Sequence, residues 1–352
     1  MTAPHRSGAR PGARNLITDV PGLRVGEAHD AAARTGVSVI LPDTAAVAAV
    51  AVLGGGPGTR ETDALAPENL VDAVDAIVLA GGSVYGLAAA DGVAGYLGAR
   101  GRGYAMVARE SVPPSPVIPA AILYDLANGG DKAWGETPPY RALGRGAAEA
   151  ATASAQGAAF ALGTAGAGYG AMAGALKGGL GSASIVTHEG ITVGALVAVN
   201  SFGAVIAPGG RAFWAAPFEL EGEFGGLGAA GLVGPPDDWG LAKNNPAARQ
   251  NTTIACVATD VALTPPQARR LAIMAQAGLA RAIRPVFAPF DGDVVFALST
   301  GGQPLPEPAN LALARLGALA ANTLARAIAR GVYEAQAWPG DATPCWRDLP
   351  AE

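Results

Sequence analysis

Thr252 begins a segment whose residue types suit nucleophilic catalysis. Residues 242–250 are largely polar and contain a proline, and they lead into the apolar, β-branched segment 252–259, which is typical of a buried strand. If the bond between Asn251 and Thr252 were cut, Thr252 would carry both a hydroxyl nucleophile and a free α-amine. The pKa of such an amine is about 7.7–8.0, so part of it is neutral and can act as a base. An ordinary strand that begins with threonine is the alternative.

Two carboxylates, Asp291 and Asp293, lie two residues apart at the start of another predicted strand. On a strand this spacing puts both side chains on one face. Paired acids at that position can orient an ammonium group and hold a hydroxyl. The alternative for this segment is a solvated Asp-Gly turn.

Three further polar residues are candidates for the same chemistry. Lys177 is the only charged residue between Glu149 and His188, which indicates either a surface lysine or a buried lysine tuned for a site. Asn200 ends a predicted strand, where its amide can donate to an oxyanion or simply form a turn. Tyr140 follows two prolines and precedes a helix, so it is either a packing residue or a phenolic donor.

Composition excludes several other classes of protein. The chain has 352 residues, of which 50% are hydrophobic and 15% charged, and this indicates a globular protein with a large core. The net charge of -5 and the pI near 5.3 argue against binding to nucleic acid or to a membrane surface. Residues 1–15 lack the apolar stretch of a signal peptide, and no uncharged run is typical of a membrane span. We therefore expect a cytoplasmic protein.

Few residues are available for metal, disulfide or histidine-dependent chemistry. Two cysteines are too few for a disulfide framework, and three histidines nearly exclude a histidine-rich zinc site. A Ser-His-Asp triad would lack its Gly-x-Ser-x-Gly turn. The glycine loop 54–58 is not followed by Gly-Lys-Ser/Thr, so it indicates a turn or a backbone approach to a ligand rather than a nucleotide site. We expect no cofactor and no metal.

The order of the predicted elements favours a layered α+β fold in a single domain, because strands cluster and helices cluster without regular alternation. The predicted strands are 35–41, 45–53, 75–80, 182–186, 191–199, 252–259 and 294–299, with a first hairpin at 16–25, extended segments at 104–107 and 116–124, and a possible sheet extension at 204–207. The predicted helices are 84–97, 142–155, 264–284 with a threonine N-cap and proline at N1, and 309–330 ended by Gly331. Residues 213–251 form a long loop of the kind that is usually functional.

Taken together, these motifs carry a resemblance to a known family. The ordered matches are ITDVPG at 17–22, LAGGSVYGL at 79–87, ALG at 142–144, NTTI at 251–254 and FDGD at 290–293. Over about residues 16–333 the chain resembles the DmpA-type L-aminopeptidase/D-esterase and β-aminopeptidase family, which includes the endo-type nylon-oligomer (6-aminohexanoate oligomer) hydrolases.

The resemblance implies a four-layer αββα sandwich and self-cleavage into residues 1–251 and 252–352, with loose tails at 1–15 and 335–352. The cleaved protomers would assemble into a homo-oligomer, a tetramer. The resemblance places the nucleophile at Thr252 and its lysine at Lys177. The oxyanion donors fall on Tyr140 and Asn200, and the supporting pair falls on Asp291 and Asp293. A threonine with two aspartates follows the nylon-oligomer enzymes, whereas the β-aminopeptidases use a serine with a Ser/Glu pair.

The sequence therefore predicts an amide hydrolase that acts through an acyl-enzyme on a small peptide or amide-oligomer substrate. Two alternatives remain at this stage. One is an acyltransferase of the ornithine acetyltransferase type, and the other is a binding protein that keeps the fold without processing. The sequence does not distinguish α-peptide, β-peptide, D-ester and ω-amide substrates.

Overall fold

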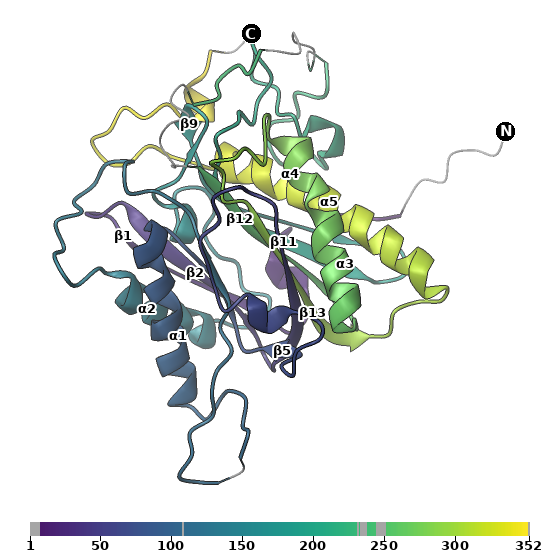
Figure 1. Cartoon of the computed structure of the whole chain (residues 1–352). Helices are drawn as coiled ribbons and strands as arrows, with labels where there is room; N and C mark the ends of the chain where they lie inside the picture. The colour runs from purple at the N-terminus through teal and green to yellow at the C-terminus, as the bar shows by residue number, and fades with distance from the viewer. Residues whose placement is uncertain (1–7, 108, 231, 233–237, 244–250, 351–352) are drawn as a thin grey trace.

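The computed structural model describes residues 8–107, 109–230, 232, 238–243 and 251–350 (Figure 1). In this part of the chain the largest sheet has six strands. Their order is β10 (Gly179–Val186), β11 (Thr192–Asn200), β12 (Thr252–Val261), β13 (Val294–Gln303), β3 (Ala46–Val52) and β5 (Ala73–Val74). Neighbouring strands are antiparallel except β12 and β13, which are parallel.

A second sheet of five strands lies against the first. Its order is β1 (Leu23–Asp30), β2 (Thr35–Pro42), β6 (Ile77–Ala80), β7 (Ala120–Ile122) and β4 (Thr59–Arg60). A separate short hairpin joins β8 (Met172–Ala173) to β9 (Leu176–Lys177). The α-helices of the described residues are α1 (Ala89–Gly98), α2 (Tyr140–Ala153), α3 (Pro265–Ala275), α4 (Ala277–Ala282) and α5 (Ala309–Tyr333).

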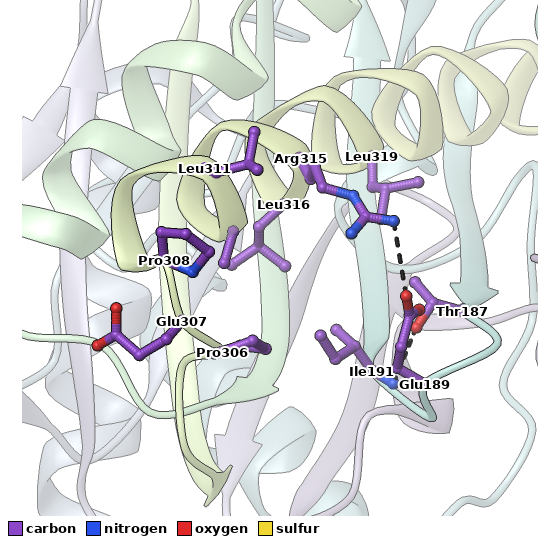
Figure 2. Close-up of a pocket in the computed structure, with 11 residues that line it drawn as sticks. Thr187, Glu189, Ile191, Pro306, Glu307, Pro308, Leu311, Arg315, Leu316 and Leu319 are labelled. Atoms are coloured by element: carbon purple, nitrogen blue, oxygen red, sulfur yellow. Dashed lines mark hydrogen bonds and ion pairs between the residues drawn. The ribbon is translucent and has the colours of Figure 1, made fainter.

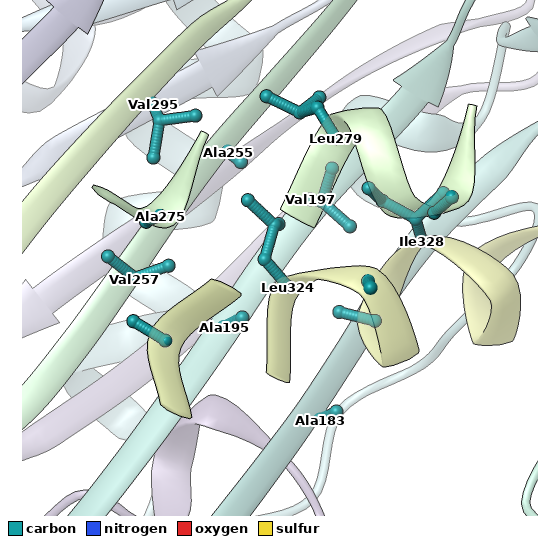
Figure 3. Packing of buried hydrophobic residues seen from close by; sticks show 14 of the residues in the cluster. Ala183, Ala195, Val197, Ala255, Val257, Ala275, Leu279, Val295, Leu324 and Ile328 are labelled. Atoms are coloured by element: carbon teal, nitrogen blue, oxygen red, sulfur yellow. The ribbon is translucent and has the colours of Figure 1, made fainter. Parts of the chain in front are cut away.

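The side chains of β12 show how the layers are built. All ten residues of this strand are buried, and successive residues point to opposite faces. Ile254 and Cys256 belong to the apolar cluster between the two sheets. Ala255 and Val257 belong to the cluster beneath α3, α4 and α5, where Val197 and Leu324 also lie (Figure 3).

Helices α1 and α2 cover the outer face of the five-stranded sheet through a third apolar cluster. The order of layers is therefore helix, sheet, sheet, helix, as expected from the resemblance. Helix α5 has the length and apolarity of a membrane span, but 56% of its most apolar window is buried in the protein.

The structure corrects the predicted boundaries of two helices. The predicted helix 264–284 is divided at Gln276 into α3 and α4. Its start is as predicted, because Thr264 and Gln267 form a capping box. Helix α5 does not end at Gly331 but continues to Tyr333. A Cβ on Gly331 would lie 2.9 Å from the backbone nitrogen of Gly181, so this glycine serves close packing between helix and strand.

Other predictions for the sheet and the termini are also wrong. Residues 16–25 form a 3₁₀ turn followed by β1, and the first hairpin is β1–β2. Residues 204–207 make only isolated bridges, to Arg284 and Phe213, and do not extend a sheet. The C-terminal segment is not loose over its described residues, because Trp338 and Trp346 are buried and each donates a hydrogen bond to a backbone carbonyl.

Candidate active site

The polarity of the central strands brings four predicted site residues to one edge of the six-stranded sheet. Strand β12 starts at Thr252, and the antiparallel strand β11 ends at its register partner, Asn200. Strand β13 runs parallel to β12 and starts at Val294, immediately after Asp293. Asn251 also forms an isolated bridge with Asp291. Thr252, Asn200 and the two acids therefore come together because of strand order.

The peptide group before Thr252 is held in a defined position. The backbone N–H of Gly292 donates to the carbonyl oxygen of Asn251 at 3.0 Å. The Thr252 hydroxyl contacts the same carbonyl oxygen. A Cβ at position 292 would lie 2.7 Å from Thr252 Oγ, so only glycine allows this approach. The Gly292 N–H is a donor that the sequence analysis missed, because a backbone group leaves no side-chain signal.

The acid pair is buried, which excludes a solvated turn. Asp291 and Asp293 are each 2% exposed, and both precede β13 rather than lying on it. Asp293 accepts hydrogen bonds from the backbone N–H of Thr253 at 2.7 Å and of Phe287 at 3.2 Å. Asp291 accepts one from Ala288 at 2.9 Å.

Burial decides the protonation of the two acids. Burial first, and then the neighbouring Asp291, raises the pKa of Asp293 to about 7. Burial also raises the pKa of Asp291, while the Ala288 N–H and the charge of Lys243 act against that rise. Asp291 Oδ1 is buried and makes no hydrogen bond of ordinary geometry within the described residues, although the nearby Phe202 N–H also acts against the rise of the Asp291 pKa. The pair therefore favours a nearby cation.

The glycine loop 54–58 supports the acid pair by backbone contact. Gly56 donates its N–H to the backbone carbonyl oxygen of Asp291 at 2.8 Å, and Gly54 donates its N–H to the backbone carbonyl oxygen of Asp293 at 3.3 Å. A Cβ on Gly54 would lie 2.3 Å from the Asp293 nitrogen. The sequence predicted a turn or a backbone approach to a ligand, and the close approach in the structure is to the backbone of residues 291–293.

Asn200 is fixed by contacts on both ends of its amide. Its oxygen accepts the N–H of Met172 at 2.9 Å and the side-chain amide of Asn128 at 3.3 Å. Its nitrogen donates to the carbonyl of Tyr124 at 3.0 Å. Together these bonds assign the oxygen and the nitrogen of the Asn200 amide and fix the orientation of the side chain. Asn128 was not predicted, because one asparagine in a loop carries no distinctive signal.

Lys177 is buried rather than at the surface. Its amino group donates to the carbonyl oxygens of Gly168 at 3.3 Å, Ala171 at 3.0 Å and Gly178 at 2.7 Å, and it lies 4.7 Å from the centre of the Trp338 ring. Burial lowers the pKa of Lys177 to about 7. Within the described residues none of its hydrogen bonds reaches Thr252 or the acid pair. Lys177 instead holds the loop whose Met172 N–H orients Asn200.

Tyr140 begins α2 and lies against Gly82, where a Cβ would be 2.3 Å from the phenolic oxygen. Its hydroxyl is buried and makes no hydrogen bond of ordinary geometry among the described residues, although the nearby Thr35 hydroxyl acts against the rise of the Tyr140 pKa. Burial, with the charge of Asp125 as the second cause, raises the pKa of Tyr140. Asp125 accepts from Thr35 at 2.6 Å and from the Gly82 N–H at 2.7 Å. Within the described residues, no hydrogen bond or ring contact joins Tyr140 to Thr252 or to the acid pair.

A cavity lies away from this edge of the sheet. It has a volume of about 170 Å³, is lined by Ile191, Leu311 and Leu316 beneath the start of α5, and carries on its rim the ion pair between Arg315 and Glu189 (Figure 2). It adjoins the opposite end of β11 from Asn200. Among the described residues, no group of three His, Cys, Asp or Glu side chains could hold a metal ion.

Comparison with known proteins agrees with this arrangement. Residues 15–344 match peptidase family S58. An uncharacterized aminopeptidase of Mycobacterium tuberculosis is 43% identical over 95% of this chain and 98% of its own length. A 6-aminohexanoate-oligomer endohydrolase of Kocuria sp. is 30% identical over 84% of this chain and 78% of its own length.

Among solved structures, the L-aminopeptidase D-Ala-esterase/amidase of Ochrobactrum anthropi, described as a variant of the Ntn hydrolase fold, superposes with a TM-score of 0.69. It covers 95% of this chain and 90% of its own at 22% identity, which establishes a shared fold. The fold is thus the α+β sandwich that the resemblance implied. The chain belongs to peptidase family S58 and is an amide-bond hydrolase.

Proposed function

We propose that Thr252 is the nucleophile of this hydrolase and that it first cleaves its own chain after Asn251. One observation carries the proposal: the Asn251 carbonyl accepts the Gly292 N–H at 3.0 Å while the Thr252 hydroxyl contacts it. A peptide bond held by a donor beside a hydroxyl and two buried carboxylates has the parts that acyl transfer requires.

In self-cleavage, Thr252 Oγ attacks the carbonyl carbon of Asn251 and gives its proton to a carboxylate of the acid pair. The carbonyl oxygen becomes an oxyanion that the Gly292 N–H stabilises. The bond to the Thr252 nitrogen then breaks, and the proton passes to that nitrogen as it leaves. The products are an ester between Asn251 and the threonine oxygen and a free α-amine. Water hydrolyses this ester to the Asn251 carboxylate and the Thr252 hydroxyl.

In turnover, the same hydroxyl attacks the substrate amide, and the free α-amine of Thr252 takes the proton as general base. The amine departs from the substrate with that proton, and water releases the acyl group. Asp291 and Asp293 hold the amine and the hydroxyl in place. Asn200 and Tyr140 stabilise the oxyanion, and the loss of one such donor typically costs about 10²–10³ in rate.

The two segments, 1–251 and 252–352, are proposed to remain one protomer after cleavage. Arg326 of the second segment is 1% exposed, and its guanidinium contacts Glu223 of the first at 2.5 Å and the Ser184 carbonyl at 2.8 Å. Strand β12 pairs with β11 from Thr252 to Thr259. Such contacts do not need a covalent link between the segments.

The proposed substrates are small peptides or amide oligomers with a 6-aminohexanoate-like repeat, because the relatives that match include both aminopeptidases and oligomer endohydrolases. A pair of aspartates beside a threonine, rather than a serine with a Ser/Glu pair, favours the second group. We also propose self-assembly of the cleaved protomers into a homo-oligomer.

The test is to sequence the N-terminus of the small fragment and to compare wild type with Thr252→Ala. We expect the wild-type fragment to begin at Thr252, and the variant to remain one chain without activity. Hydrolysis of amino-acid p-nitroanilides, β-alanyl amides and 6-aminohexanoate oligomers then ranks the substrate classes. A fragment that begins elsewhere, or a Thr252→Ala variant that still hydrolyses amides, would refute the proposal.

A further inference from the structure

Residues 168–172 run into the start of β8 and orient the proposed oxyanion donor, Asn200. The backbone N–H of Met172 donates to the Asn200 side-chain oxygen at 2.9 Å. Every residue of segment 168–172 makes a hydrogen bond to a side chain outside it: Gly168 and Ala171 to Lys177, Tyr169 to Trp338, Gly170 to Asn128, and Met172 to Asn200. The orientation of the Asn200 amide therefore depends on how this short segment is held.

Trp338 holds the segment from the C-terminal part of the chain. This side chain is 4% exposed, and its indole N–H donates to the carbonyl of Tyr169 at 2.8 Å. The amino group of Lys177 lies 4.7 Å from the centre of the indole ring, so Trp338 also contacts the lysine that binds two carbonyls of the segment. Among the described residues after Thr252, no other side chain makes a hydrogen bond to segment 168–172.

Other contacts fix Trp338 itself. The guanidinium carbon of Arg34 lies 4.8 Å from the centre of the indole ring, and Arg34 also forms an ion pair with Asp341 at 2.6 Å. The N–H of Asp341 donates to the carbonyl of Trp338 at 3.0 Å, and the carbonyl of Pro344 accepts the backbone N–H of Lys177 at 2.8 Å. Trp338 therefore has a defined position against the loop that contains Lys177.

We propose that Trp338 is a positioning residue for turnover, whose indole holds segment 168–172 and Lys177 so that the Asn200 amide meets the oxyanion of the substrate. This inference rests on the oxyanion role proposed for Asn200 above. Asn200 belongs to segment 1–251 and Trp338 to segment 252–352, so the C-terminal part of one segment completes the site of the other. A donor contributes fully only where it matches the developing oxyanion, and a displacement of about 1 Å can cost a factor of about 100 in rate.

The same reasoning separates turnover from self-cleavage. In self-cleavage the oxyanion forms on the carbonyl of Asn251, which the Gly292 N–H holds at 3.0 Å. In the described structure neither Trp338 nor segment 168–172 makes a hydrogen bond to Asn251, Thr252 or Gly292. Trp338 should therefore affect kcat much more than the rate of self-cleavage, whereas a general loss of structure would slow both.

The experiment compares Trp338→Phe, which removes the indole N–H, with the matched control Trp346→Phe. Trp346 is also buried in the C-terminal part of the chain, at 5% exposure, and donates its indole N–H to the carbonyl of Arg211 at 2.9 Å. The assay uses the amide of the panel above that wild type hydrolyses fastest. Trp338→Phe should lower kcat about tenfold and keep KM within about threefold, while Trp346→Phe should keep kcat within about twofold.

Two further measurements separate the indole N–H from the fold. Both variants should self-cleave within about threefold of the wild-type rate, followed on denaturing gels after pulse-labelled cell-free translation. Replacing Trp338 by 3-benzothienylalanine keeps the shape of tryptophan but puts sulfur in place of the N–H. This replacement should also lower kcat about tenfold, because it removes the bond to the Tyr169 carbonyl without removing the ring.

A double-mutant cycle tests whether Trp338 acts through Asn200. In an Asn200→Ala background, Trp338→Phe should change kcat by less than about twofold, because no amide remains to be oriented. The inference is overturned if both replacements of Trp338 keep the wild-type kcat, if Trp346→Phe loses as much, if the effects of Trp338→Phe and Asn200→Ala multiply, or if self-cleavage slows in parallel with kcat. A wild-type kcat for Asn200→Ala alone would instead overturn the oxyanion role proposed for Asn200, and this inference with it.

Discussion

Replacing Asp293 by asparagine should change how the stability of the protein depends on pH. Burial beside Asp291 raises the pKa of Asp293 from 3.8 to about 7, so the folded protein holds this proton more tightly than the unfolded chain does. The stability that the bound proton contributes is fully present below about pH 4 and is lost as the pH rises through about 7. Because asparagine cannot ionise, the stability of the variant should not show this fall as the pH rises.

The magnitude follows from the size of the shift. At about pH 5, the stabilisation has already fallen by an amount equivalent to roughly one of the three pKa units of the shift. At about pH 8.5 it has fallen by an amount equivalent to about all three. Two units correspond to about 3 kcal/mol, the amount by which the difference in stability should move in favour of the variant. Asparagine has one side-chain acceptor for the two N–H groups of Thr253 and Phe287, which should cost about 1–2 kcal/mol at every pH.

The assay is urea denaturation at about pH 5 and 8.5, with Thr252→Ala as parent so that both chains stay uncleaved. Lys177 and Lys243 also titrate abnormally, with pKa values lowered to about 7, but both proteins contain them and their contributions cancel to first order. In the cleavable chain, Asp293→Asn should abolish most hydrolysis. Parallel pH profiles for parent and variant would refute the view that Asp293 carries a proton in the folded protein.

Three further predictions test the supports of the site. Lys177→Met removes the donor of three buried carbonyls and should lower kcat more than tenfold with less effect on KM, in steady-state amide hydrolysis. Gly292→Ala would place a Cβ 2.7 Å from Thr252 Oγ and should slow self-cleavage by about 100-fold or more, as read by gel after pulse labelling. Arg326→Met removes the 2.5 Å ion pair of buried Glu223 and, among the described residues, leaves it only the longer ion pair with Arg330 at 3.8 Å. The free energy of unfolding should fall by about 3 kcal/mol, and adding Glu223→Leu should restore part of the loss in urea denaturation.

The elements that the sequence predicted well are those in which one local signal decides the outcome. The β-branched run 252–259 became β12, and the capping box at Thr264 started α3 where expected. The failures arise where tertiary contacts override local preference. Gly331 is an ordinary helix terminator by propensity, yet it stays helical because Gly181 packs directly against it.

The same distinction applies to the site. Thr252, Asp291 and Asp293 could be predicted because the short motifs that contain them, NTTI at 251–254 and FDGD at 290–293, stand at the starts of apolar strands. Trp338 does not stand out, because its proposed role depends on a hydrogen bond to Tyr169, which is distant in sequence. Lys177 was identified from its isolation among small residues, but sequence could not tell that its amino group binds backbone carbonyls rather than the nucleophile.

Strand polarity explains how one edge of a sheet can hold Thr252, Asn200 and the acid pair before any bond is cut. Because β12 is parallel to β13 and antiparallel to β11, the start of β12, the start of β13 and the end of β11 meet at this edge (Figure 1). The first paired residue of β12 is Thr252 itself, so a cut before it leaves its ladder with β11 intact and removes only the isolated bridge between Asn251 and Asp291. Strands β12 and β13 would then belong to one segment and their outer neighbours, β11 and β3, to the other. Self-cleavage at this position would therefore create the amine that turnover needs while the sheet continues to hold the two segments together.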